Sequence, residues 1–319
     1  MIITVTLNAA MDKTLEVPSF TPGRRHRTVD QTTMPGGKGV NIARAIKRLG
    51  QPVIATGLAG GATGSRIVEA LNDESILNDF VRIGDESRTN TAVLDPTTGL
   101  QTEINERGPA VSERELELFR EKLLYLAQGA SICLFAGSLP RGVEADVYFT
   151  LIREVRRLGV TTIIDSDGEP LRLSMRAEPD LVSPNELEAE ELVGHEFNDG
   201  HDRAQAVVEM TRQGAHEAIM TVGDGCYARL LADGSPTLFR ARVAEQEARS
   251  AVGSGDAFLA GYVASRYAER GPEESLRFGV ACGAESTQHF GAGILDPARV
   301  DRLLSEVDCE RLEVEAEIG

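Results

Sequence analysis

The sequence predicts a three-layer α/β fold, in which helices cover both faces of a doubly wound, mostly parallel sheet and a small β-sheet forms a lid. Short apolar runs alternate with amphipathic stretches of helical length, and 319 residues with 41% apolar content suffice for a large core. Residues 14–33 and 87–107 instead have the pattern of strands and turns without helices. No repeat or linker divides the chain. We therefore expect one domain over residues 1–319, with a lid formed by insertions at about 12–35 and 87–108.

The order of the expected elements supports this fold class. Strands are expected in the apolar runs at residues 2–6, 53–57, 131–137, 161–165, 180–183 and 218–223. Helices are expected at residues 38–50, 113–128, 145–159, 202–214 and 256–269. Because ligands of such sheets bind beyond the carboxyl ends of the strands, functional residues should directly follow strands. Asp12 and Ser138 both occur in segments that follow an expected strand.

The composition excludes several classes of partner. A net charge of −17 and an isoelectric point near 4.8 disfavour non-specific binding to nucleic acid or to an anionic membrane. The four cysteines form no metal-binding or disulfide pattern. No signal-peptide pattern and no apolar run of about 18 residues occurs. We expect a cytoplasmic protein with reduced cysteines that binds neither nucleic acid nor membrane.

The stretch SAVGSGDAFLAGY, residues 250–262, places an aspartate at the start of an apolar helix. Gly253 and Gly255 allow a close approach of the backbone to a ligand, and the start of a helix offers free N–H groups to an anion. The segment suits a phosphate-binding turn. Asp256 is then either a catalytic base beside that phosphate or only an N-terminal cap of the helix.

The stretch PGGKGVNIARAIKRLG, residues 35–50, is a second glycine-rich start of a helix. It is not a P-loop, since Lys38 is followed by Gly39 rather than by serine or threonine. Its glycines suit a backbone that packs against a polyhydroxylated ligand, and Asn41 could offer that ligand both a donor and an acceptor. The alternative is an ordinary glycine-rich beginning of a helix.

Two further clusters suggest binding of phosphate and metal. PGRRHRT, residues 22–28, would place Arg25 and Arg27 on one face of a β-strand, where two guanidinium groups suit a phosphate monoester that Arg88 could also contact. A basic strand edge that discourages aggregation is the alternative. In SPNELEAEEL, Asn185 and Glu188 would share one helical face and supply oxygen ligands for Mg²⁺, or would form only a capping box.

Together these stretches resemble the ribokinase/phosphofructokinase-B family of carbohydrate kinases. GGKGVNIARAIKRLG and SAVGSGDAFLAGY resemble its two signatures, Asn185-x-x-Glu188 its magnesium motif, and TVGDG, residues 221–225, its nucleotide loop. The resemblance extends from Asn8 to about Gly293. TLNAAMDKT, TEINERGP and GSLP are similar to the hexose-phosphate branch, of the 1-phosphofructokinase and tagatose-6-phosphate kinase type. Ser183 departs from the family, which usually has lysine there.

The resemblance implies a ribokinase-like fold and ATP-dependent phosphorylation of a primary hydroxyl of a ketohexose phosphate. Fructose 1-phosphate is the expected substrate, with tagatose 6-phosphate or fructose 6-phosphate as the alternative. More distant alternatives are a ribokinase or nucleoside-type kinase and a non-catalytic sugar-phosphate sensor. The PGRRHRT cluster favours a substrate that already carries a phosphate. The resemblance also implies a homodimer formed through the lid.

The resemblance assigns roles to individual residues. Asp256 would be the base, in a catalytic turn with Gly253, Ser254 and Gly255. Asp12, Gly37, Lys38 and Asn41 would hold the sugar, and Arg25, Arg27, Arg88 and Ser138 the region of its phosphate. Asn185, Thr221, Gly223, Gly225, Val252, Gly253 and Gly255 would bind ATP, and Asn185 and Glu188 would hold Mg²⁺.

Overall fold

The computed structural model describes residues 1–244, 248 and 250–312, and these contain a central sheet of ten strands. The strand order is β14-β13-β12-β11-β10-β9-β8-β1-β4-β5. The parallel part consists of β1 (Ile2–Thr6), β4 (Val53–Gly60), β5 (Leu77–Ile83), β8 (Ile132–Ala136), β9 (Thr161–Asp165), β10 (Leu181–Val182) and β11 (Glu217–Val222). At one edge β12 (Gly225–Ala232), β13 (Ser235–Arg242) and β14 (Asp308–Leu312) continue the sheet in antiparallel pairing.

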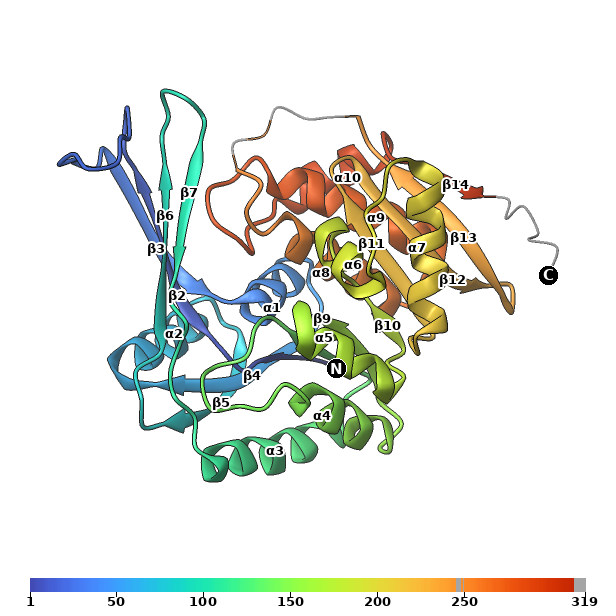
Figure 1. Cartoon of the computed structure of the whole chain (residues 1–319), viewed down its shortest axis with the longest axis horizontal. Helices are drawn as coiled ribbons and strands as arrows, with labels where there is room; N and C mark the ends of the chain where they lie inside the picture. The colour runs from blue at the N-terminus through green and yellow to red at the C-terminus, as the bar shows by residue number, and fades with distance from the viewer. Residues whose placement is uncertain (245–247, 249, 313–319) are drawn as a thin grey trace.

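Helices cover both faces of this sheet (Figure 1). One face carries α1 (Lys38–Arg48), α2 (Gly61–Asp73), α8 (Ser254–Tyr267), α9 (Pro272–Ser286) and α10 (Pro297–Leu304). The other carries α3 (Glu113–Ala127), α4 (Val147–Arg156), α5 (Gly168–Ser174), α6 (Glu186–Val193) and α7 (Gly200–Arg212), with the short 3₁₀ helix Met175–Ala177. Side chains alternate between the faces, so Ile2 of β1 belongs to one hydrophobic core and Ile3 to the other.

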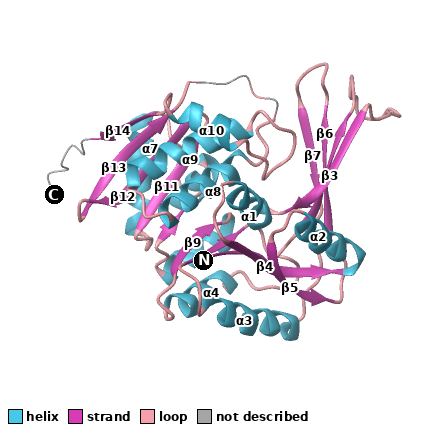
Figure 2. Ribbon diagram, turned by 180° about the vertical axis from the view of Figure 1, so that it is seen from behind, coloured by secondary structure: helices cyan, strands magenta, loops and turns pink. Residues whose placement is uncertain are grey.

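The lid is a separate sheet of four strands beside the body (Figures 1 and 2). It consists of β3 (Asp30–Gly36), β2 (Ala10–Glu16), β6 (Arg88–Leu94) and β7 (Gln101–Asn105) in that order. β2 pairs antiparallel with β3 and parallel with β6. Since β3 ends at Gly36 and α1 begins at Lys38, only Gly37 separates this lid strand from the body helix α1.

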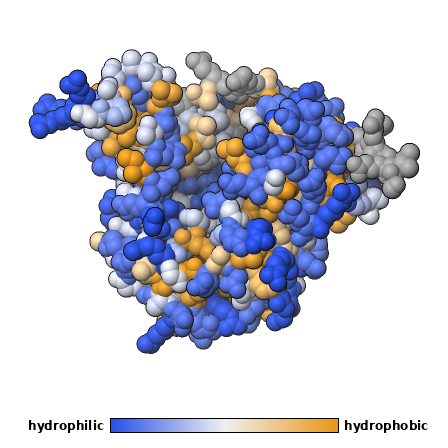
Figure 3. Space-filling view, viewed as in Figure 1, coloured by the Kyte–Doolittle hydropathy of each residue, from blue (hydrophilic) through white to orange (hydrophobic). Residues whose placement is uncertain are grey.

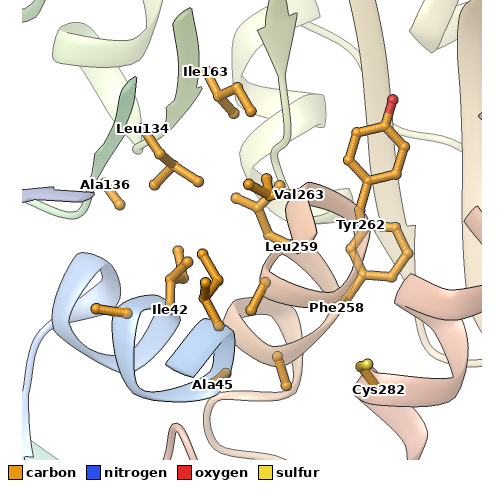
Figure 4. Packing of buried hydrophobic residues seen from close by; sticks show 14 of the residues in the cluster. Ile42, Ala45, Leu134, Ala136, Ile163, Phe258, Leu259, Tyr262, Val263 and Cys282 are labelled. Carbon is orange, nitrogen blue, oxygen red and sulfur yellow. The ribbon is translucent and has the colours of Figure 1, made fainter. Parts of the chain in front are cut away.

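Helix α8 is fixed in the core, which gives its first turn a defined position. Figure 4 shows Phe258, Leu259, Tyr262 and Val263 of α8 among buried side chains of α1, β8, β9 and α9. A Cβ at Gly261 would lie 2.6 Å from Sγ of Cys282, so α8 and α9 pack closely there. Such close packing leaves few alternative positions for the helix.

The fold class and the strands and helices expected in the body are confirmed, with ends displaced by a few residues. The structure also contains elements that were not predicted, among them α2 and the antiparallel strands β12 to β14. Helix α2 was not predicted because its first turn is rich in glycine, which is unusual in helices. No helix in the described part of the chain combines the length and the apolar character that a membrane crossing requires.

The expected strand that would carry Arg25 and Arg27 is absent, and this prediction was wrong. Both residues are exposed in the connection between β2 and β3, which contains turns around Gly23 (φ +79°). The N–H of Arg24 donates to the carbonyl of Thr21 at 3.4 Å. Pro22 and Gly23 favour this turn over an extended strand.

Candidate active site

A cleft of about 880 Å³ lies between the lid and the carboxyl ends of the parallel strands. Figure 3 shows the molecule hollowed between the lid sheet and the body, with hydrophilic residues around the hollow. The residues that line the cleft come from most of the chain, from Asp12 of the lid to Ala292 after α9. The predicted site residues that line it are Asp12, Gly37, Lys38, Asn41, Arg88, Ser138, Asn185, Glu188, Thr221, Gly223, Gly225, Val252, Gly253, Ser254, Gly255 and Asp256. Arg25 and Arg27 are not among the described residues that line it.

Asp256 lies in the first turn of α8 and is 7% exposed. The N-cap of α8 is Gly253, and no side chain caps the helix, so the interpretation of Asp256 as the cap was wrong. Nδ2 of Asn41 donates to Oδ2 of Asp256 at 2.8 Å. Burial and the nearby charge of Asp165 raise the pKa of Asp256 to about 7, against the opposing effects of Lys38 and Asn41. A carboxyl group with this pKa can exchange a proton near neutral pH.

The turn before α8 suits a bound phosphate. Gly253 has φ +78°, and a Cβ there would lie 2.8 Å from Cα of Ala292, so only glycine fits without displacement. Nothing lies within 4 Å of a Cβ placed on Gly255, which leaves the approach to the helix open. The N–H groups of a first helical turn lack acceptors within the helix, and the helix dipole adds positive potential there. This turn can therefore bind an anion beside Asp256.

Lys38 occupies the middle of the cleft between two carboxylates. Its Nζ lies 2.7 Å from Oδ1 of Asp165 and 3.0 Å from Oε1 of Glu188. Burial alone would lower the pKa of Lys38, but the charges of Asp165, Glu188 and Asp256 together raise it above its ordinary value. Lys38 therefore stays charged. Its ion pairs connect α1 with the end of β9 and with the first turn of α6.

The residues predicted to hold Mg²⁺ form the anticipated capping box of α6. Oδ1 of Asn185 accepts from the N–H of Glu188, and Oε2 of Glu188 accepts from the N–H of Asn185, both at 2.9 Å. This leaves Oε1 of Glu188 to face Lys38. No group of three or more His, Cys, Asp or Glu residues that could hold a metal occurs in the described part of the chain. One or two carboxylate oxygens fit Mg²⁺ that keeps most of its waters.

Polar groups converge on the lid side of the cleft. Nδ2 of Asn90 donates to Oδ1 of Asp12 at 2.9 Å, and Oδ1 of Asn90 is buried without a partner among the described residues. Oδ1 of Asn41 is in the same situation. Burial raises the pKa of Asp12, while the Asn90 hydrogen bond and Arg88 oppose this shift. Unpaired buried acceptors next to a cleft fit a ligand that brings hydroxyl donors.

Arg88 and Ser138 both contact Asn8. Nε of Arg88 donates to the carbonyl of Asn8 at 3.1 Å, and Nδ2 of Asn8 lies 3.3 Å from Oγ of Ser138. Both side chains line the cleft, so they can contact the same anionic group.

The opposite end of the cleft contains the loop predicted to bind a nucleotide. Thr221 is half-buried near the end of β11, and its N–H donates to the carbonyl of Pro184 at 3.1 Å, next to Asn185. Gly223, Gly225 and Val252 line the cleft here. Ser183, which stands where the related family usually has lysine, is buried and also lines it.

Sequence reasoning missed Asp165 and Asn90 as site residues. Asp165 is the last residue of β9, at the carboxyl edge where functional residues were expected, so its position was the available signal. Asn90 lies inside β6, and only the pairing of β6 with β2 brings it next to Asp12. No local pattern marks it.

The chain is similar to bacterial sugar-phosphate kinases. It is 33% identical over 284 residues to a 1-phosphofructokinase of Borreliella burgdorferi, covering 89% of this chain and 90% of that protein. It is 29% identical to a tagatose-6-phosphate kinase of Staphylococcus epidermidis, covering 97% and 99% of the two chains.

Solved structures agree in fold. Phosphofructokinase-2 of Escherichia coli in complex with substrates and products superimposes with a TM-score of 0.88 at 30% identity, over 95% of this chain and 98% of that one. A ribokinase of Arabidopsis thaliana superimposes with a TM-score of 0.74 at 23% identity, over 95% and 98%, which confirms the ribokinase-like fold.

The model of the pfkB family of carbohydrate kinases matches residues 4–299, nearly the whole described chain. The prediction of an ATP-dependent sugar-phosphate kinase is confirmed at this level, whereas the individual hexose phosphate is left open by these similarities. With its fold and its four motifs in one cleft, the chain belongs to the pfkB family of carbohydrate kinases.

Proposed function

We propose that this kinase transfers the γ-phosphoryl group of ATP to a primary hydroxyl of a ketohexose phosphate, and that fructose 1-phosphate is its substrate. The observation that carries the proposal is the position of Asp256, a buried carboxyl group beside an anion-binding turn at the floor of the cleft. A base and a phosphate site in contact are what the transfer of a phosphoryl group to an alcohol requires.

The proposed step begins with the sugar hydroxyl next to Asp256. Its oxygen forms a bond to the γ-phosphorus while the bond from that phosphorus to the bridging oxygen of ADP breaks. The hydroxyl proton passes to Asp256, and because Asn41 engages Oδ2, we assign the proton to Oδ1. The N–H groups at the start of α8 stabilise the charge on the transferred group. Positioning and electrostatics account for most of the rate gain in such reactions.

We assign Mg²⁺ to the side of the cleft formed by α6. Glu188 would hold it through water by Oε1, near Asn185, and Asp165 lies on the other side of the same lysine. When bound, the ion would neutralise phosphate oxygens of ATP. Lys38 would then lie between Asp256 and the carboxylates of Asp165 and Glu188. The nucleotide would extend toward Thr221, Gly223 and Gly225.

We assign the sugar to the lid side, where Asp12, Asn41 and Asn90 offer hydrogen-bonding groups. Arg88 and Ser138 would contact its existing phosphate, which favours a phosphorylated sugar over ribose or a nucleoside. TLNAAMDKT, TEINERGP and GSLP resemble the hexose-phosphate branch as a whole. Within this branch fructose 1-phosphate is preferred because a 1-phosphofructokinase is among the relatives. Tagatose 6-phosphate is the second candidate, favoured by the similarity to a tagatose-6-phosphate kinase.

We propose a homodimer that forms through the lid. Three large apolar side chains of the lid are exposed, Val29 at 65%, Leu100 at 70% and Ile104 at 62%, which favours contact with another protein surface. Arg25 and Arg27 project from the lid rather than into the cleft of their own chain, so a role in phosphate binding would require the cleft of a second chain. Light scattering after gel filtration tests the dimer, and a monomer would contradict it.

The experiment that tests the function measures ADP release with fructose 1-phosphate, fructose 6-phosphate, tagatose 6-phosphate and unphosphorylated fructose. We expect the highest kcat/KM with fructose 1-phosphate and little turnover of fructose. The same panel is repeated with Arg88→Met, which should lose more activity toward the phosphates than toward fructose. Higher activity with tagatose 6-phosphate would reassign the substrate. Binding of a sugar phosphate without ADP release would instead identify a sensor.

A further inference from the structure

Arg44 is a buried arginine of α1 whose exposed fraction is 3%. Its Nε donates to both carboxylate oxygens of Glu74 in the segment after α2, at 3.0 and 2.9 Å, and its Nη2 lies 2.8 Å from Oε1 of the same residue. Its Nη1 donates to the carbonyl of Ala292 at 2.7 Å. The planar guanidinium group therefore joins two segments in a fixed geometry.

The segment that Arg44 holds forms the wall behind the anion-binding turn. Ala292 lies where a Cβ on Gly253 would be, with its Cα only 2.8 Å from that position. On the other side of the segment, a Cβ on Gly293 would lie 2.9 Å from the carbonyl of Asn41 and 3.0 Å from Cβ of Arg44. Residues 291–293 are thus packed between α1 and the start of α8, and a shift of Ala292 would displace Gly253.

The same arginine contacts the lid. Nη1 of Arg44 lies 3.4 Å from Sδ of Met34 in β3, and a Cβ on Gly291 would collide with the end of the Met34 side chain. Arg44 also follows Asn41, which orients Asp256, by three residues on α1. Helix α1 therefore contacts the base through Asn41, and through Arg44 it holds Ala292, which packs against the anion-binding turn.

We propose that Arg44 is a positioning residue for phosphoryl transfer, which fixes the anion-binding turn at Gly253 by holding Ala292 in place. This inference rests on the proposed function for its kinetic consequence. Hydrogen-bond donors stabilise a transition state only if they are already in position, and a displacement of about 1 Å is costly. Arg44 itself is not placed in contact with either substrate.

The kinetic test compares Arg44→Met with Arg48→Met, which removes a positive charge from the exposed end of the same helix. For Arg44→Met we expect kcat to fall by roughly tenfold or more, with the KM for the sugar phosphate changed less than about threefold, because the interaction lost acts in the transition state. Arg44→Lys keeps one donor for Ala292 but cannot bind Glu74 through two, so its kcat should be intermediate. Arg48→Met should match the wild type.

Hydrogen exchange measured by mass spectrometry tests the positioning without turnover. In Arg44→Met, amide exchange should rise in peptides covering 250–257 and 291–293 and stay unchanged elsewhere, including in Arg48→Met. If Arg44→Met does not fold, the same exchange is measured in Arg44→Lys. Wild-type kcat with wild-type exchange would overturn the proposal, as would a uniform rise over the whole chain. A wild-type protein that releases no ADP would refute the proposed function, and the exchange result would still decide on Arg44.

Discussion

Nδ2 of Asn41 donates a 2.8 Å hydrogen bond to Oδ2 of Asp256, which joins the first glycine-rich helix to the second. The bond uses the amide group of Asn41 to hold the base, while its Oδ1 is buried and unpartnered among the described residues. Asn41 was expected to bind sugar with both a donor and an acceptor. The structure commits one of its two N–H donors to Asp256 and leaves Oδ1 unpaired, as the proposed contact with a sugar hydroxyl requires.

This relationship predicts the pH dependence of the enzyme. Burial raises the pKa of Asp256 to about 7, and a base must be deprotonated to act. The plot of kcat/KM against pH should therefore have an ascending limb with its midpoint near pH 7. Asn41→Ala removes a donor that stabilises the carboxylate, so the limb should move to higher pH. Asn90→Ala, which removes a donor to Asp12 instead, is the matched control and should leave the limb in place. A limb near pH 4 in the wild type would contradict this role of Asp256.

Removal of the central lysine should destabilise the protein as well as slow it. Lys38→Met leaves Asp165 and Glu188 without their shared partner, and an unpaired buried polar group costs about 1–3 kcal/mol. Urea unfolding should show this loss. Lys122→Met, which breaks an ion pair with the more exposed Asp79, should cost less than about 1 kcal/mol. Equal losses in the two variants would contradict the account of Lys38.

The capping box allows the proposed metal role of Glu188 to be separated from its structural role. Glu188→Gln keeps a side chain that can cap α6, but it removes the negative charge at Oε1. We expect an unchanged helix content by circular dichroism and a higher Mg²⁺ concentration for half-maximal turnover. Glu186→Gln, in the same helical turn, is the control. If both variants require the same Mg²⁺ concentration as the wild type, Glu188 does not hold the ion.

The anion-binding turn should tolerate no side chain at Gly253. Gly253→Ala adds both a strained positive φ and a collision with Ala292, so kcat should fall by at least about tenfold. Gly50→Ala carries the same strain, with φ +77°, but meets nothing within 4 Å and lies at the end of α1. Its stability should fall while its kcat stays near the wild-type value. Retained activity in Gly253→Ala would contradict the close packing of this turn.

The sequence predicted those features of the site that local patterns encode. The two glycine-rich helix starts and the Asn185-x-x-Glu188 pattern depend on short-range geometry, and each forms where it was expected. Asp165 and Arg44 were missed because their importance comes from partners more than 100 residues away along the chain. A carboxylate that ends a strand or an arginine within a helix has many ordinary explanations. Only the packed structure shows which partner each one meets.

The prediction that Arg25 and Arg27 share one face of a strand was wrong for a related reason. Alternation along a strand was assumed, yet Pro22 and Gly23 redirect the chain into turns before β3 begins at Asp30. The residue types predicted a cluster of positive charge in this segment. Whether the two arginines share one face depends on where the strand begins, and β3 begins only after them.

The most direct test of the central claim is the turnover of Asp256→Asn, measured by ADP release with fructose 1-phosphate. The amide keeps the size of the side chain and can still accept the hydrogen bond from Asn41, so the fold and the binding of ATP should be preserved. We predict that kcat falls by at least about two decades while the dissociation constant for ATP changes little. Turnover close to that of the wild type would show that Asp256 is not the base.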